Sequence, residues 1–223
     1  MTDSCVPAPR PAYRLVPSRF PPIGLFDTVA TAADAAAVME LAGWTNDRLV
    51  AERIDRLPRD QWVYGRANAS IVMASFLHVA PGGMRFNGPD LGAWYASASI
   101  VTAAAEVGHH LRREAVARSV KTMRRTYRTY SAALIGEYLD ICGKQAAYPD
   151  AYASGSYGGA QVLGETVRAS TAAGIAYDSL RHRGGTNVVG YRPAGITDVV
   201  QTDHFEISIE AASRRIDVHK LSI

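Results

Sequence analysis

Short segments rich in β-branched and aromatic residues dominate the second half of this 223-residue sequence. Three of them, Ile175 to Asp178, Asn187 to Tyr191 and His204 to Ile209, have the length and composition of β-strands. Arg125 to Leu139 also favours strand through its tyrosines and threonines, whereas Leu134 to Ile141 fits a second strand or a helix. Because strands outnumber helices in this half, we predict an α+β fold with a mixed or antiparallel sheet.

A helix is predicted directly after a short buried strand from Ala93 to Ser97. Ser97 or Ser99 can cap its first turn, and the helix runs to about Arg118. Apolar residues recur on one stripe at helical spacing, namely Ile100, Ala103, Ala104, Val107, Leu111 and Ala115. Another helix is predicted from Gly159 to Ser170. These helices supply the second layer of the predicted fold.

The first third of the sequence predicts a helical block behind one short strand. Tyr13 to Val16 is apolar between prolines and predicts an edge strand. The alanine-rich stretch Thr31 to Leu41 predicts a helix that stops at Gly43, and Asp47 to Leu57 predicts a second helix. Ser70 to Val79 is rich in Ile, Val and Phe and predicts a further strand.

Composition places the chain among ordinary globular proteins. Hydrophobic residues make up 48% and charged residues 20%, which excludes a disordered chain. The length fits one domain, which we expect to cover residues 1–223. Cys5 and Cys142 are too few for a disulfide scaffold and indicate a reducing compartment. The N-terminal residues have no apolar core, and Ala69 to Ala80 is too short to cross a bilayer, so we expect a cytoplasmic protein without membrane contact.

Net charge gives little support for a nucleic-acid-binding surface. The formal charge is +3, and arginine supplies nearly all of the basic residues. Binding to a phosphate backbone usually needs a denser basic patch. We therefore expect no direct contact with nucleic acid.

Several common catalytic motifs are missing. The sequence has no GxxxxGK[ST] phosphate loop, no GxGxxG after a strand, no HExxH and no G-x-S-x-G elbow. Glu106, His109 and His110 place a carboxylate and imidazoles on one helix, but a di-metal bundle needs a second such pair and further carboxylates. We interpret this stretch as a solvated polar helix face and expect no metal site.

A stronger constellation begins at Arg85. Arg85-Phe86-Asn87 stands among glycines, which leave room beside the arginine side chain. Tyr95 follows on the short strand, and Glu106 lies two turns into the next helix among small residues. A carboxylate with space above it is typical of a ligand pocket. The alternatives are a structural arginine tying a turn, a core aromatic and a surface glutamate.

Ser179 is a further candidate. It ends the apolar strand that starts near Ile175 and precedes the turn at Gly184 and Gly185. Site residues often lie at strand ends beside turns. A lone serine there can equally be a strand-end cap, and no partner histidine stands in a recognisable hydrolase order.

Together these residues resemble the RES domain, a family named after an Arg, a Glu and a Ser. The resemblance rests on Arg85-Phe86-Asn87, Tyr95, Glu106, and the strand end at Ser179 followed by Gly-Gly-Thr-Asn187. It covers roughly residues 70–209. Tyr13-Arg14 also resembles the family's first strand, which often carries an arginine of the site.

The resemblance implies a bacterial toxin that is paired with an Xre-type helix-turn-helix antitoxin. Such proteins degrade NAD⁺, and characterised members use inorganic phosphate as the acceptor, with no bound cofactor. The family implies a core similar to that of ADP-ribosyltransferases, with a cleft between two sheets, and a homodimer or a hetero-oligomer with the antitoxin. By position, the resemblance implies four catalytic residues, and it implies less directly that Arg14 and Asn187 bind the substrate. The four are Arg85, Tyr95, Glu106 and Ser179.

The residue types suit this chemistry. Loss of nicotinamide leaves a ribosyl cation, which a carboxylate such as Glu106 can stabilise while it bonds the ribose hydroxyls. Tyr95 can stack on the nicotinamide ring or bond the ribose through its hydroxyl, and Arg85 can grip the pyrophosphate or the attacking phosphate. Ser179 can orient the substrate. The sequence leaves phosphate and water open as acceptors.

Two rival functions stay open at this point. One is transfer of ADP-ribose onto a protein, against which Ala104 argues, because such transferases often carry an acidic residue two positions before the glutamate. The other is a non-catalytic partner of a helix-turn-helix regulator. The chain also departs from the family in the long separation of Arg14 from Arg85, which we attribute to a helical insertion at about residues 28–58.

Overall fold

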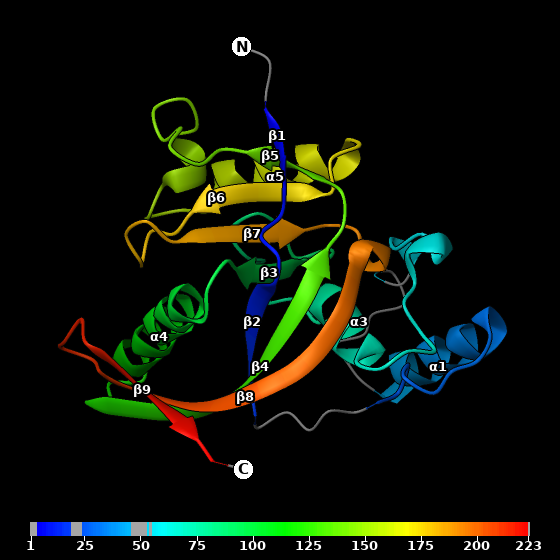
Figure 1. Ribbon diagram of the computed structural model, residues 1–223, viewed down its shortest axis with the longest axis horizontal. Helices are drawn as coiled ribbons and strands as arrows, with labels where there is room; N and C mark the ends of the chain where they lie inside the picture. Colours follow the sequence, from blue (N-terminus) through cyan, green and yellow to red (C-terminus); the bar gives the residue numbers. More distant parts are fainter. Residues whose placement is uncertain (1–3, 19–23, 46–52, 54, 223) are drawn as a thin grey trace.

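The computed structural model describes residues 4–18, 24–45, 53 and 55–222. Within them a nine-stranded sheet has the order β1-β5-β6-β7-β3-β2-β4-β8-β9 (Figure 1). The strands are β1 (Cys5–Pro7), β2 (Ala12–Pro17), β3 (Trp94–Ser97), β4 (Thr122–Leu134), β5 (Glu137–Asp140), β6 (Gly174–Asp178), β7 (Thr186–Gly190), β8 (Ile196–Glu210) and β9 (Ile216–Leu221). Only β5 and β6 pair in parallel, so the predicted α+β fold with a mixed sheet is confirmed.

Four α-helices and three 3-10 helices lie among the described residues. They are α1 (Ala32–Thr45), α3 (Ala69–Leu77), α4 (Ile100–Ala117), α5 (Gly158–Ala169), η1 (Arg59–Gln61), η2 (Asp150–Tyr152) and η3 (Pro193–Gly195). Helix α4 packs on β2, β4 and β8, and α5 covers the β5–β6–β7 part of the sheet (Figure 1). None of the helices in the described ranges is long and apolar enough to cross a membrane.

The sheet consists of two parts that meet at one residue pair. Strands β5, β6, β7 and β3 form one part, and β2, β4, β8 and β9 form the other (Figure 1). The link is β2 to β3, where the only paired residues are Tyr13 and Ser97. The family's expected two sheets are therefore two parts of one continuous sheet. The N-terminal segment reaches both parts, because β1 pairs with β5 and β2 pairs with β4.

Helix α4 follows its predicted local signals closely. Ser99 is the N-cap, and its hydroxyl accepts a hydrogen bond from the Thr102 backbone N–H at 3.1 Å. Of the apolar stripe, Ala103, Ala104, Leu111 and Ala115 are buried against the sheet. This burial fixes the rotation of the helix and turns its other face away from the sheet core.

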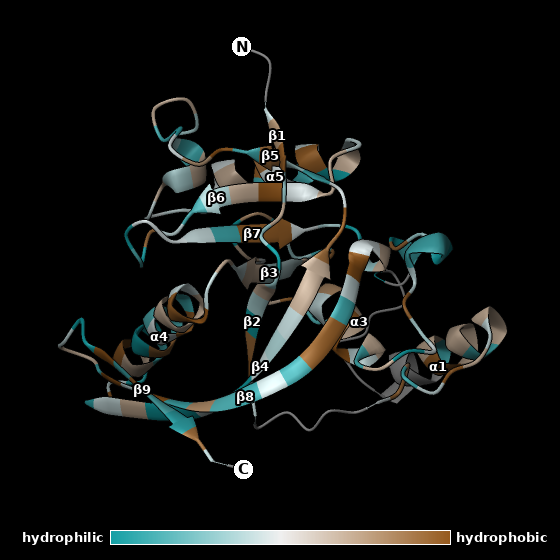
Figure 2. Cartoon of the chain, viewed as in Figure 1, coloured by the Kyte–Doolittle hydropathy of each residue, from teal (hydrophilic) through white to brown (hydrophobic). Residues whose placement is uncertain are grey.

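Helix α3 contradicts the strand predicted over Ser70 to Val79. Most of its residues are buried, including Val72, Met73, Phe76 and Leu77, and the less buried positions are also apolar, so the helix has no exposed polar face. A helix buried on every side shows no polar face and cannot be told from a buried strand by periodicity. Figure 2 shows the contrast with β8, which carries both hydrophilic and hydrophobic residues and alternates between them from Phe205 to Glu210.

Other predicted boundaries need correction. Tyr13 to Val16 is a strand, but β2 lies between β3 and β4 and is not at an edge. The helix from Thr31 continues past Gly43 to Thr45. Most of the helix predicted from Asp47 to Leu57 lies outside the described residues. Strands β1 and β9 were not predicted, because β1 has only three residues and no residue of either strand is fully buried.

The remaining strand and helix predictions are confirmed. Arg125 to Leu139 lies in strands β4 and β5, which settles the ambiguity in favour of strand. The predicted strands near Ile175, Asn187 and His204 are β6, β7 and β8.

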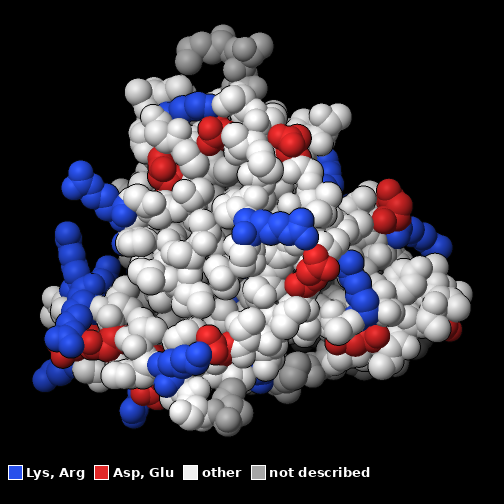
Figure 3. All heavy atoms as spheres, in the orientation of Figure 1, with Lys and Arg blue, Asp and Glu red and all other residues white. Residues whose placement is uncertain are grey.

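Figure 3 shows the distribution of charged side chains on one face of the molecule. On this face Lys and Arg gather mainly at the margin where Figure 1 places α4 and β9, mixed with Asp and Glu.

Gly164 provides a test of how α5 is seated. A Cβ there would lie 2.0 Å from the Phe86 carbonyl oxygen and 2.8 Å from the Tyr191 hydroxyl. We expect Gly164→Ala to lower the free energy of unfolding by about 1–3 kcal/mol in urea denaturation, because backbone must move to admit the methyl group.

Gly158→Ala is the matched control in the same helix. Its Cβ would meet only the Ser156 hydroxyl, at 3.6 Å. We expect a stability within about 0.5 kcal/mol of the parent protein or slightly above it. Equal stabilities of the two variants would contradict the close packing of α5 against the loop at Phe86.

Candidate active site

A cavity of about 400 Å³ opens where β2, β3 and α4 meet the loop around Arg85 and the turn after β6. Its wall combines a carboxylate, several guanidinium groups and aromatic rings. Five of the six predicted site residues line it, namely Arg14, Arg85, Tyr95, Glu106 and Asn187. The structure therefore brings together residues that are far apart in the sequence.

Glu106 is held by one of its two carboxylate oxygens. The Ser179 hydroxyl donates to Oε1 at 2.7 Å, and the Asn187 side-chain amide donates to the same oxygen at 2.8 Å. Asn187 is itself fixed, because its Oδ1 accepts a hydrogen bond from the Ser97 hydroxyl at 2.6 Å. Oε2 makes no hydrogen bond with the described residues. One oxygen thus orients the carboxylate, and the other is available to a ligand.

Ser179 lies behind Glu106 and does not line the cavity. Its hydroxyl donates to Glu106 and accepts hydrogen bonds from the backbone N–H groups of Arg181 at 3.1 Å and His182 at 2.9 Å. The residue is only 8% exposed. The strand-end cap considered for this serine is therefore confirmed, and the same hydroxyl also positions the Glu106 carboxylate.

Arg85 is anchored and still faces the cavity. Its Nη1 donates to the carbonyl oxygens of Ala151 and Ala153, both at 3.0 Å, and its guanidinium lies 4.9 Å from the centre of the Tyr157 ring. It forms no ion pair with a described carboxylate. Arg85 thus ties down the turn around η2, as a structural arginine would, and leaves its positive charge unneutralised.

Tyr95 uses its hydroxyl to hold the Arg85 loop. The oxygen accepts a hydrogen bond from the Phe86 N–H at 2.9 Å, and the hydroxyl donates to Asn87 Oδ1 at 2.8 Å. Burial raises the pKa of Tyr95 well above its usual value, although the Phe86 N–H and the charges of Arg168 and Arg85 oppose that shift. The hydroxyl therefore stays protonated and engaged, so the ring is the part of Tyr95 that can meet a ligand.

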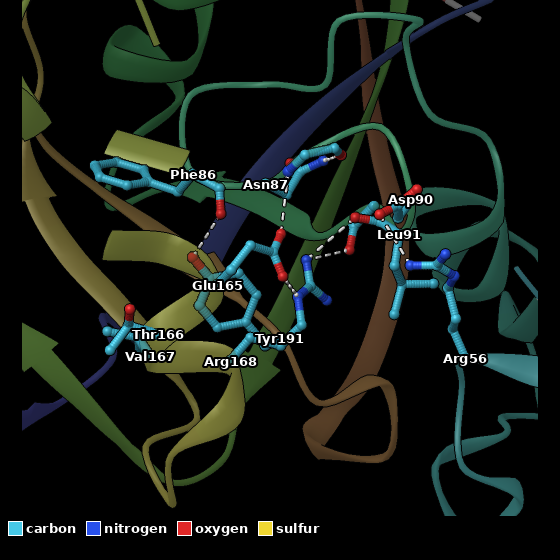
Figure 4. Close-up of polar contacts among 12 residues, drawn as sticks. Arg56, Phe86, Asn87, Asp90, Leu91, Glu165, Thr166, Val167, Arg168 and Tyr191 are labelled. Atoms are coloured by element: carbon cyan, nitrogen blue, oxygen red, sulfur yellow. Dashed lines mark hydrogen bonds and ion pairs between the residues drawn. The ribbon is translucent and has the colours of Figure 1, made fainter. Parts of the chain in front are cut away.

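Helix α5 supports this loop from the other side (Figure 4). Glu165 Oε1 accepts a hydrogen bond from the Gly88 N–H at 3.0 Å, and Arg168 Nη2 donates to the carbonyl oxygens of Leu91 and Gly92 at 3.2 and 2.9 Å. Glu165 and Arg168 also form an ion pair at 3.0 Å. Sequence reasoning missed both residues, and the only signal for them was an acid and a base three positions apart on a helix.

Arg14 is a half-buried cation with few partners among the described residues. Its Nη1 donates to the Tyr95 carbonyl oxygen at 3.1 Å, and its guanidinium lies 4.9 Å from the centre of the Trp94 ring. Its Nε atom is buried and has no hydrogen-bond partner within the described part of the chain. Burial lowers the pKa of Arg14 to about 10, so the group is charged at neutral pH. An unpaired guanidinium in a cavity wall favours an anionic ligand.

The sequence predicted that the helix face at Glu106, His109 and His110 is a solvated polar face. The structure differs, because this face borders the cavity. All three residues line the cavity, together with Arg181 and Tyr157, which sequence reasoning also missed. Among the described residues no group of three or more His, Cys, Asp or Glu side chains is arranged to hold a metal ion. The arrangement is one carboxylate among three guanidinium groups, which suits a ligand that carries both sugar hydroxyls and negative charge.

A sequence model of the RES domain matches residues 51–210, which is well over half of the chain. The resemblance to the RES domain is thereby confirmed, and the match includes Arg85, Glu106 and Ser179 but not Arg14. Among solved structures, the chain is similar to the crystal structure of the M. tuberculosis MbcT-MbcA toxin-antitoxin complex, with 17% identity and a TM-score of 0.41. That similarity covers 55% of this chain and 73% of the other. No curated protein matches the sequence.

The acid limb of the stability profile tests the environment of His109. Burial, followed by the positive charges of Arg181 and other neighbours, lowers the pKa of His109 to about 4 from an ordinary value near 6.5. Between these two pH values His109 is protonated in the unfolded chain and neutral in the folded chain. We therefore expect this contribution to stability to be complete above pH 6.5 and to be lost as the pH falls towards 4.

His109→Gln should flatten this part of the profile when urea unfolding is measured at pH 7 and pH 5. His219→Gln, which removes an exposed histidine from β9, is the matched control. NMR titration of the His109 ring gives a direct check. A titration midpoint near pH 6.5 would contradict the burial of this side chain.

Proposed function

Because the chain belongs to the RES domain family, we propose that it degrades NAD⁺ by cleaving the bond between nicotinamide and ribose, with inorganic phosphate as the acceptor. The observation that carries this proposal is the Glu106 carboxylate. One of its oxygens is fixed by Ser179 and Asn187, and the other is free in the wall of the cavity. A ligand with a ribose that becomes cationic matches this group.

Glu106 acts on the reacting sugar. As nicotinamide departs, positive charge develops on the ribosyl carbon and ring oxygen, as in glycoside cleavage. A carboxylate that is already oriented stabilises this charge without having to reorganise during the reaction. Oε2 can also accept a hydrogen bond from a ribose hydroxyl. Ser179 and Asn187 serve as positioning residues in this scheme, because they act through Glu106.

Arg14 and Arg85 receive the negative part of the substrate. Both guanidinium groups line the cavity and neither has a carboxylate partner among the described residues. Each is anchored by a hydrogen bond to a backbone carbonyl, which reduces the entropy lost when a ligand binds. Guanidinium groups bind pyrophosphate oxygens with paired hydrogen bonds. We assign the pyrophosphate of NAD⁺ to these two arginines.

Tyr95 contributes its ring. Its hydroxyl is committed to Phe86 and Asn87, so the hydrogen bond to ribose considered from the sequence would require breaking both contacts. Stacking of the ring against a planar aromatic ligand group needs no such change. The role left for Tyr95 is therefore to hold the Arg85 loop and to provide a flat wall for the nicotinamide.

Transfer of ADP-ribose to a protein is the second candidate reaction, and one observation disfavours it. Ala104, two positions before Glu106, is 5% exposed and packs in the core under α4. No acidic side chain stands there to activate a protein acceptor. We also propose that this core is similar to that of the ADP-ribosyltransferases and that its cavity is a cleft for NAD⁺. This similarity supports cleavage of the bond between nicotinamide and ribose, and it does not identify the acceptor.

We further propose that the chain is the toxin of a toxin-antitoxin pair whose partner is an Xre-type helix-turn-helix protein. Membership of the RES family supports this assignment. A homodimer or a hetero-oligomer with the antitoxin follows from the same reasoning. The rival function is a non-catalytic partner of a helix-turn-helix regulator. That function would not explain why the cavity holds an oriented carboxylate and arginines without carboxylate partners.

Replacement of the carboxylate is the first test. Glu106→Gln keeps the size of the side chain and an oxygen that can accept from Ser179 and Asn187, but it removes the negative charge. We expect loss of NAD⁺ consumption by about 100-fold or more in the presence of phosphate, with the melting temperature nearly unchanged. Glu40→Gln, the same change at an exposed site on α1, is the control and should retain full activity. Full activity in the Glu106 variant would refute the assignment of the site.

The fate of the ribosyl group is the second test. NAD⁺ labelled in its adenylate part is incubated with the protein, phosphate and a bacterial lysate. Phosphorolysis predicts label in ADP-ribose 1″-phosphate, and hydrolysis predicts free ADP-ribose. A labelled protein band would instead establish protein modification and overturn the proposed reaction. If the NAD⁺ were recovered intact, the chain would be a non-catalytic partner.

A further inference from the structure

Arg181 is an arginine of the cavity wall that the proposed function has not used. It lies in the turn between β6 and β7 and is half-buried. Unlike Arg14 and Arg85, its guanidinium makes no hydrogen bond and no ion pair with any described residue. Burial lowers the pKa of Arg181, and the nearby Glu106 carboxylate opposes that shift. This side chain is therefore a cation beside Glu106 whose donors are all unoccupied.

The backbone of Arg181 is tied to the Glu106 carboxylate through one hydroxyl. Ser179 Oγ accepts the Arg181 N–H at 3.1 Å and donates to Glu106 Oε1 at 2.7 Å. The Arg181 backbone is therefore held at a fixed distance from the Glu106 carboxylate. The guanidinium is free to move at the end of its own side chain, while its point of attachment stays beside the carboxylate.

The turn that carries Arg181 is docked firmly on α4. His182 Nδ1 lies 2.9 Å from the Thr102 hydroxyl, and the Ser179 N–H donates to the Gly185 carbonyl oxygen at 2.8 Å. Gly185 leaves no room for a side chain, because a Cβ would lie 2.6 Å from the Thr102 hydroxyl. The turn thus has little freedom to carry Arg181 away from the cavity.

Charge distinguishes the two acceptors that compete for the ribosyl carbon. Phosphate carries between one and two negative charges at neutral pH, so it is repelled by the Glu106 carboxylate as it approaches the sugar. Water carries no charge and meets no such repulsion. A cation next to Glu106 removes the barrier for phosphate and has little effect on water. Arg14 and Arg85 are anchored on other elements, and the pyrophosphate of the substrate engages them.

We propose that Arg181 binds the acceptor phosphate and thereby directs the ribosyl group to phosphate instead of water. This inference rests on the proposed degradation of NAD⁺. In the step, a phosphate oxygen forms a bond to the ribosyl carbon as the carbon–nitrogen bond breaks. The electron pair of that bond goes to the ring nitrogen, and nicotinamide leaves as a neutral molecule. No proton needs to be transferred, and nothing is oxidised or reduced.

The experiment compares the parent protein with Arg181→Gln, Arg181→Lys and Arg183→Gln. Arg183 is the matched control, because it is exposed in the same turn, does not line the cavity and pairs with no described residue. NAD⁺ loss is followed while phosphate is varied, and the products are separated into ADP-ribose 1″-phosphate and ADP-ribose. We expect Arg181→Gln to raise the KM for phosphate about 10- to 100-fold, with the KM for NAD⁺ changed much less.

The product ratio should move towards ADP-ribose in Arg181→Gln, should recover in part in Arg181→Lys, and should stay at the parent value in Arg183→Gln. A parallel measurement records the shift in melting temperature that inorganic phosphate alone produces. We expect this shift to shrink in Arg181→Gln. An unchanged KM for phosphate and an unchanged product ratio in that variant would overturn the inference.

The outcome for the parent protein separates this inference from the proposed function. Stabilisation by phosphate that depends on Arg181, without any NAD⁺ turnover, would refute the proposed function and retain the anion site. NAD⁺ turnover in the parent protein that does not respond to phosphate would refute the acceptor site and retain NAD⁺ cleavage.

Discussion

The hydrogen bonds to Glu106 Oε1 are the interaction on which the site depends. They join α4 to the end of β6 through Ser179 and to β7 through Asn187, and the bond from Ser97 extends the network to β3. Two distant parts of the sequence, β3 with α4 and β6 with β7, are thus joined through one carboxylate oxygen and the Asn187 side chain. A carboxylate held in this way costs little to reorganise when positive charge appears next to it.

The charge balance of the cavity follows from this arrangement. One carboxylate faces Arg14, Arg85 and Arg181, and none of these arginines has a carboxylate partner among the described residues. A half-buried cation without an ion-pair partner is unfavourable to folding, and an anionic ligand of the kind proposed would offset this cost. Sites built for function commonly carry such a cost.

Local signals were enough to predict much of the fold. The Ser99 cap and the apolar stripe located α4, and the strands β6, β7 and β8 followed from their composition. Helix α3 could not be predicted by periodicity, because it lacks the exposed polar face that marks an amphipathic helix. Arg85 and Glu106 were predicted as site residues from their sequence context and from the resemblance to the RES domain, and both line the cavity. Arg181 and Glu165 were missed, because their neighbours are defined only by tertiary packing.

The single residue pair between β2 and β3 has a mechanical consequence. The other strand pairs of the sheet lie within one part or the other, and among the residues that the structure describes Tyr13 and Ser97 alone pair across the junction. Arg14, the next residue, bonds to the Tyr95 carbonyl oxygen across this same seam. Backbone pairing therefore joins β2 and β3 at a single point, and the hydrogen bonds from Ser179 and Asn187 to Glu106 span the same seam, because α4 packs on β2, β4 and β8. The Glu106 carboxylate therefore serves the sheet as well as the cavity, because it fastens the two parts together where backbone pairing is sparse.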